Sequence, residues 1–116
     1  MAGYQNLYLN QAETFDTDIN LSDSNNLPYN LTNFTVQSSA KKSYYSNSVI
    51  INFNATITDA NNGIINLSAN NTVTSNVQPG ILIYDVLISD NSGTVTRVLE
   101  GQVYVSPGVT GVSYSY

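Results

Sequence analysis

The feature that most constrains this chain is a period-two alternation of apolar and polar side chains, which is longest between residues 49 and 57. Phe53, Ala55 and Ile57 are separated there by the polar residues Asn54 and Thr56. A shorter alternation runs from residue 15 to residue 21. Because successive side chains of a β-strand point to opposite faces, this pattern predicts strands with one buried face. The residues expected to face the core are Phe15, Ile19, Phe34, Val36, Ile51, Phe53, Ile57, Ile65 and Leu67.

Turn-forming residues separate the expected strands at short intervals. Residues 22–28, 59–63 and 90–93 are rich in Asn, Asp, Ser, Gly or Pro, which favour turns. The connection from residue 70 to residue 80 has room for one helical turn, which Pro79 and Gly80 would end. The sequence contains neither a longer helical pattern nor an internal repeat. It therefore predicts an all-β sandwich or barrel. We expect one domain over residues 1–106 and an extended tail over residues 107–116.

The surface is expected to be polar but weakly charged. Only 9% of the residues are charged, against roughly 25% in an average domain. Three Lys and Arg against eight Asp and Glu leave a net charge of −5, which disfavours nucleic acid and anionic membranes as partners. We expect no signal peptide and no membrane helix, because no apolar run approaches the ~20 residues that a span requires. Such a surface suits a protein that works inside an assembly.

Most catalytic and metal-binding chemistry is missing from the residue set. The chain has no His and no Cys, which excludes His-based triads, thiol nucleophiles and thiolate zinc sites. Glu13 and Glu100 are a remote candidate for a glycosidase pair, since such enzymes need two carboxylates at a defined separation. Residues 59–63 resemble the opening of a calcium loop, but the spacing is one residue short and no closing Glu follows, so we interpret them as a turn. We expect no enzyme activity, cofactor or metal.

The hairpin expected between residues 81 and 105 carries the only arginine of the chain. A three-residue loop with a glycine in the left-handed position would pair Asp90 with Thr94. That register sets Leu87 opposite Arg97 and leaves Asp85 diagonal to Arg97, within reach of its long side chain. We therefore predict a structural ion pair between Asp85 and Arg97.

The same register sets Tyr84 opposite Glu100 and Val86 opposite Val98. The face that carries the ion pair is then expected to include four apolar residues, Ile81, Ile83, Leu99 and Val103. Apolar residues fall on both faces of residues 81–88. One face covers the core, so the other must be covered by another part of the chain or by a partner.

Two groups of tyrosines are candidates for an interface. Tyr44 and Tyr45 are adjacent, and Tyr114 and Tyr116 lie in the tail with Val112. Tyrosine rings suit a sugar-binding platform because they offer a flat apolar face with a polar handle. They are equally favoured at protein–protein interfaces.

The tail itself is expected to pack against something. Val112, Tyr114 and Tyr116 fall on one side of an extended segment, with Ser113 and Ser115 on the other. Such a segment can add to the exposed edge of a sheet. We hypothesise that the tail is held by a neighbouring chain; the alternative is that it folds back along its own domain.

Seven short segments follow one another in a characteristic order: residues 11–15, 28–32, 63–67, 78–80, 84–86, 97–101 and 103–105. This order resembles the small immunoglobulin-like β-sandwich proteins of tailed-phage virions. The chain resembles the short virion structural proteins of T4-like cyanophages and related marine phages, and it is also similar to the N-terminal attachment domain of phage baseplate upper proteins. The resemblance covers most of residues 4–106 and implies an antiparallel sandwich of about seven strands, without catalytic residues.

The resemblance implies a role in assembly. We expect a structural protein of the virion, made in the host cytoplasm, that decorates or attaches to the head, neck, tail or baseplate. Its partners would be other virion proteins, with the chain present in many copies or as a homo-oligomer. The alternative is a carbohydrate-binding module used in adhesion to the host.

Overall fold

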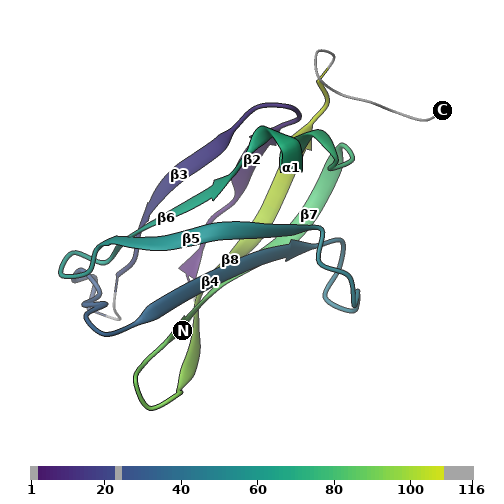
Figure 1. The fold of residues 1–116 in the computed structure, drawn as a ribbon. Helices are drawn as coiled ribbons and strands as arrows, with labels where there is room; N and C mark the ends of the chain where they lie inside the picture. The colour runs from purple at the N-terminus through teal and green to yellow at the C-terminus, as the bar shows by residue number, and fades with distance from the viewer. Residues whose placement is uncertain (1–2, 23–24, 109–116) are drawn as a thin grey trace.

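The regular secondary structure of the described residues is almost entirely β-strand. A computed structural model describes residues 3–22 and 25–108, and within them it holds eight strands and one short helix (Figure 1). In chain order these are β1 Gly3–Tyr4, β2 Leu7–Asn10, β3 Phe15–Asn20, β4 Thr35–Lys41, β5 Ile51–Asp59, β6 Ile64–Ala69, α1 Asn71–Ser75, β7 Gly80–Ser89 and β8 Val95–Ser106.

The strands form two packed layers that β5 joins. The larger sheet contains β1 and β2, which both pair with β8, followed by β7, β4 and the start of β5. The smaller sheet contains the rest of β5, then β6 and β3. Ile51 to Phe53 pair with β4, whereas Asn54 to Asp59 pair with β6, so β5 passes from one layer to the other. The predicted immunoglobulin-like sandwich is confirmed.

The prediction of a purely antiparallel sandwich is wrong at the first strands. β1 and β2 run parallel to β8, with Leu7 opposite Val103 and Asn10 opposite Ser106. Strands joined by tight hairpins must be antiparallel, but β2 and β8 are separated by most of the chain and carry no such constraint. Alternation within a strand reveals which face is buried and not the direction of its partner.

The core contains every residue that the alternation assigned to it. All nine are buried or partly buried in one hydrophobic cluster. Alternate residues of β2, β7 and β8 complete the cluster, because those strands also turn one face inward. The main additions are Leu7, Leu9, Leu82, Tyr84, Val86, Ile88, Leu99, Val103 and Val105.

The expected single helical turn is present as α1, which has only five residues. Asn70 caps its start, since the Asn70 side-chain oxygen accepts a hydrogen bond from the Val73 N–H at 3.0 Å. The helix lies in the connection between the two sheets, at the end of the sandwich where β2 ends (Figure 1).

The β7–β8 hairpin has the predicted register at its tip and a different one beyond it. The Asp90 N–H donates to the Thr94 carbonyl at 3.1 Å, and Leu87 lies opposite Arg97, as expected. A β-bulge follows, which sets Val86 opposite Leu99.

Because of the bulge, the next two predicted pairings are wrong. Val86 does not face Val98, and Tyr84 faces Gly101 in place of Glu100. The one-residue shift turns Leu99 and Val103 into the core, so neither lies on the outer face with Ile81 and Ile83 as predicted.

Candidate functional site

The outer face of β7 is unusually apolar for a surface. Ile81, Ile83 and Leu87 alternate with the buried core residues of the same strand and point the other way. Ile81 is 55% exposed, and Ile83 and Leu87 are half-buried. The expected apolar second face of this strand is therefore present.

Two stacked tyrosines extend this apolar face across the larger sheet. Tyr8 of β2 lies opposite Tyr104 of β8, and Tyr104 lies opposite Ile81 of β7. The tyrosine rings stack with centroids 5.4 Å apart and an interplanar angle of 15°. Tyr8 is 73% exposed. We call Tyr8, Tyr104 and Ile81 the aromatic strip.

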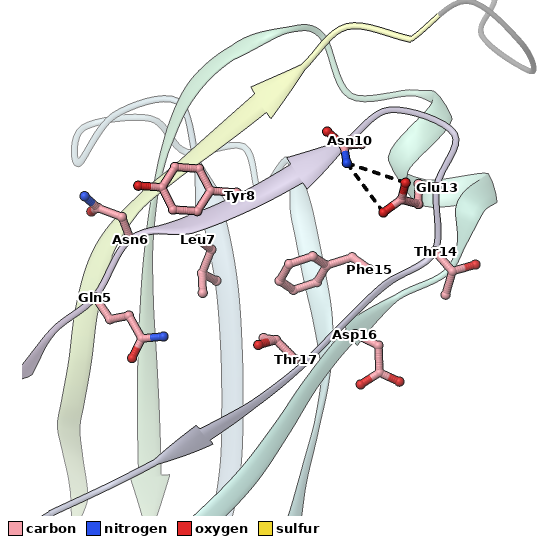
Figure 2. Close-up of a pocket in the computed structure, with 10 residues that line it drawn as sticks. All are labelled: Gln5, Asn6, Leu7, Tyr8, Asn10, Glu13, Thr14, Phe15, Asp16 and Thr17. Atoms are coloured by element: carbon pink, nitrogen blue, oxygen red, sulfur yellow. Dashed lines mark hydrogen bonds between the residues drawn. The ribbon is translucent and has the colours of Figure 1, made fainter.

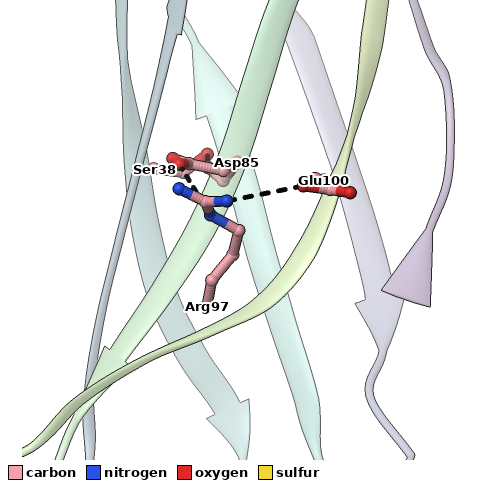
Figure 3. A network of polar contacts seen from close by, with 4 residues as sticks. All are labelled: Ser38, Asp85, Arg97 and Glu100. Atoms are coloured by element: carbon pink, nitrogen blue, oxygen red, sulfur yellow. Dashed lines mark hydrogen bonds and ion pairs between the residues drawn. The ribbon is translucent and has the colours of Figure 1, made fainter. Parts of the chain in front are cut away.

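A charge cluster lies beside the strip on the same face. Arg97 Nε is 3.3 Å from Asp85 Oδ2, so the predicted ion pair is present. Arg97 Nη1 is also 3.6 Å from Glu100 Oε2, because the bulge brings Glu100 opposite Asp85 (Figure 3). From the core side, Ser38 Oγ donates to the Asp85 carbonyl oxygen at 2.6 Å. The cluster combines two carboxylates with one guanidinium.

We predict that the ion pair adds little to stability. The Arg97 side chain is 51% exposed and that of Asp85 33%, so water screens the attraction. Arg97→Met and Asp85→Ala should each lower the free energy of unfolding by no more than about 1 kcal/mol. Urea unfolding measures this, with Lys42→Met as the control for removing a positive charge. A loss of several kcal/mol in Asp85→Ala alone would contradict it, because that is how a buried pair behaves.

Of the residues predicted to form an interface, the structure describes only Tyr44 and Tyr45. Tyr44 and Tyr45 lie between β4 and β5, and Tyr45 is 94% exposed. Tyr44 helps to line a hollow of about 290 Å³ together with Lys41, Ile83 and Leu87, so it borders the outer face of β7. Val112, Tyr114 and Tyr116 lie outside the described residues.

The remaining candidate carboxylates do not form one centre. Glu100 contacts Arg97 on β8, whereas Glu13 lies between β2 and β3 beside Asn10. Residues 60–63 form a turn, as predicted, in which the Asn62 amide donates to Asp59 at 2.8 Å. Within residues 3–22 and 25–108, no three His, Cys, Asp or Glu side chains are grouped as a metal site would need. Over the same residues, no helix has the length and apolar character of a membrane span.

A second feature that the sequence did not reveal is a groove of about 430 Å³ between β2 and β3. Leu7 of β2 and Phe15 and Thr17 of β3 point into it (Figure 2). The groove marks the side on which the two sheets remain apart. It arises because β2 joins the larger sheet and β3 the smaller one.

Comparison with known proteins supports the fold and assigns neither a family nor a function. No protein-family model and no curated protein matches the sequence. Among solved structures, the chain is similar to the GspB Siglec domain, with a TM-score of 0.53 and 13% identity over 91% of this chain and 55% of that one. It thus spans about half of that structure. Its likeness to an internalin-like protein of Listeria monocytogenes (TM-score 0.46, 18% identity, 90% of this chain and 28% of that one) is weaker. So is that to the PKD domain of human KIAA0319 (TM-score 0.42, 13% identity, 98% and 91%).

Proposed function

We propose that this chain is a non-catalytic protein-binding domain that docks through the outer face of β7 and β8, as a structural protein of a tailed-phage virion. The observation that carries the proposal is the aromatic strip. Tyr8 and Ile81 expose apolar surface on either side of Tyr104, and contiguous patches of this kind mark interaction sites. Tyrosine is also enriched at the centre of such interfaces.

The strip is suited to binding because it is held rigid. β7 and β8 are paired along nearly their whole length, and β2 pairs with the far side of β8. Its three residues therefore need little ordering when a partner arrives, which reduces the entropic cost of association. The neighbouring cluster of Asp85, Arg97 and Glu100 supplies a polar rim that restricts the partner's charge pattern.

The setting in a virion is supported by the sequence resemblance and by the low density of charge. A chain with only 9% charged residues has little electrostatic protection against association. That property suits a subunit which spends its working life packed against neighbours.

Disrupting the strip should abolish assembly without unfolding the domain. In the double variant Tyr8→Ser/Ile81→Ser, we expect incorporation into particles to fall at least about tenfold, since a loss of 1.4 kcal/mol of binding is already tenfold. Quantitative mass spectrometry of purified particles measures the copy number. Val95→Ser is the matched control, because Val95 is 54% exposed at the far end of the hairpin. Equal incorporation of the double variant and the control would contradict the proposal.

A second candidate function is carbohydrate binding, which the exposure of Tyr44 and Tyr45 favours. The likeness to the GspB Siglec domain shows the fold alone and does not decide between the two functions. A glycan array separates the two functions. Saturable binding that is lost in Tyr44→Ala or Tyr45→Ala would favour the sugar, and its absence would favour the protein partner.

A further inference from the structure

The groove between β2 and β3 has the form of a vacant strand position. Each of these strands pairs with a single neighbour within the described residues, β2 with β8 and β3 with β6. Their other edges face each other across the groove (Figure 2). Unpaired edges present backbone N–H and C=O groups that an extended peptide can bind.

The groove also offers an apolar floor. Leu7 is buried, and Phe15 and Thr17 are half-buried, so a strand inserted here would extend the core with its inward side chains. Neither β2 nor β3 contains a Lys or a Pro, the residues that commonly protect an edge from pairing.

The described part of the chain ends beside this groove. Gln11, the residue directly after β2, donates its N–H to the Ser106 carbonyl at 3.1 Å. Its side-chain oxygen accepts a hydrogen bond from the Gly108 N–H at 2.9 Å. The described chain therefore ends, at Gly108, beside the residue that follows β2. Eight extended residues reach about 27 Å, whereas the six residues of β3 span about 20 Å.

The sequence of these residues matches what the groove requires. Val112, Tyr114 and Tyr116 alternate with Ser113 and Ser115. In an extended segment, one side would then be apolar and the other polar. The segment carries no charged residue, so it brings no charge of its own toward the acidic side chains around the groove.

Topology argues against insertion of a chain's own segment. The strand order would be β8, β2, inserted segment, β3. The connection leaving β8 would have to pass over β2, while residues 11–14, which join β2 to β3, already pass over the groove at that same end. Connections at one end of a sheet do not cross in this way.

We propose that the groove between β2 and β3 receives residues 112–116 of a second copy of the chain. Each copy then donates one segment and accepts another. The donor and acceptor surfaces differ, so the contact is head-to-tail and builds either a closed ring or an open chain of subunits. Tyr8 borders both the groove and the aromatic strip, whereas neither Tyr104 nor Ile81 lines the groove, so the strip remains available for a different protein.

Cysteine crosslinking of the full chain tests this proposal directly, because the natural sequence has no cysteine. One preparation carries Thr17→Cys, at a position that lines the groove, and another carries Tyr114→Cys, on the apolar side of the segment that would face Thr17. Mixed under oxidising conditions, they should give a disulfide-linked species with twice the mass of one chain, in clear excess over either preparation alone. Thr56→Cys on the exposed face of β5 replaces Thr17→Cys in the control mixture and should give no such excess.

Two results would overturn the proposal. One is an equal yield of the disulfide-linked species in the mixture with Thr17→Cys and in the control mixture with Thr56→Cys. The other is a chain carrying both Thr17→Cys and Tyr114→Cys that links within itself and stays monomeric at all concentrations, which would show insertion of its own segment. Truncation after Ser106 should convert the oligomer to a monomer in sedimentation. Failure of these tests would leave strip-dependent incorporation intact, so the two proposals can fail separately.

Discussion

Gly63→Ala is expected to lower the free energy of unfolding by about 3–5 kcal/mol, the sum of backbone strain and overpacking. Gly63 has a φ of +67°, which disfavours any side chain. An added Cβ would lie 2.6 Å from the Leu21 carbonyl oxygen and 2.7 Å from that of Tyr29. Both obstacles are backbone, so neither can rotate away. The same glycine accepts the Leu21 N–H at 2.8 Å, which holds the segment before β4 against the β5–β6 turn.

Gly93→Ala is the matched control for this prediction. Gly93 also has a positive φ, +87°, but an added Cβ would meet no atom within 4 Å. The control therefore measures backbone strain alone, for which we expect about 1 kcal/mol. Urea denaturation of both variants gives the two free energies. If Gly63→Ala lowered the free energy of unfolding no more than Gly93→Ala does, the tight packing of residue 63 against residues 21 and 29 would be refuted.

Gly101→Ala is expected to cost about 3 kcal/mol and to detach β1 and β2 from β8. An added Cβ at this position would lie 2.1 Å from the Gln5 carbonyl oxygen. That oxygen also accepts a hydrogen bond from the buried Tyr84 hydroxyl. The Gln5 N–H in turn donates to the backbone carbonyl oxygen of Glu100 at 3.0 Å. The clash would therefore displace Gln5, which lies between β1 and β2 and helps to hold both strands against β8.

Hydrogen exchange locates this effect. Amides of residues 3–10 should lose protection in Gly101→Ala before those of β5 and β6 do. Gly3→Ala is the control, because its added Cβ would make only an ordinary contact of 3.4 Å with Leu99. Since Tyr8 belongs to β2, incorporation into particles should fall together with the protection. Unchanged exchange across residues 3–10 would contradict the prediction.

The parts of the fold that could be predicted are those with a local signal. The alternation in β5 identified Ile51 and Phe53 as core residues, and the turn at residues 60–63 marked the hairpin to β6. The parallel pairing of β1 and β2 with β8 could not be predicted, because it joins residues 96 positions apart, such as Leu7 and Val103, and leaves no local pattern.

In the candidate site, too, the residues with a local signal could be predicted and the others could not. Asp85 and Arg97 were identified because both lie close to the tip of the β7–β8 hairpin, where the turn sets the register. Glu100 was missed because the bulge after Arg97 shifts the register by one residue. The stack of Tyr8 on Tyr104 was missed because it depends on the parallel pairing.

The most direct test of the proposed function is to locate the chain in a density map of intact phage particles that encode it. We predict that the domain is present in the particle and that the face of Tyr8, Tyr104 and Ile81 is buried against a different protein. A map in which that face points into solvent, or particles that lack the chain, would contradict the account.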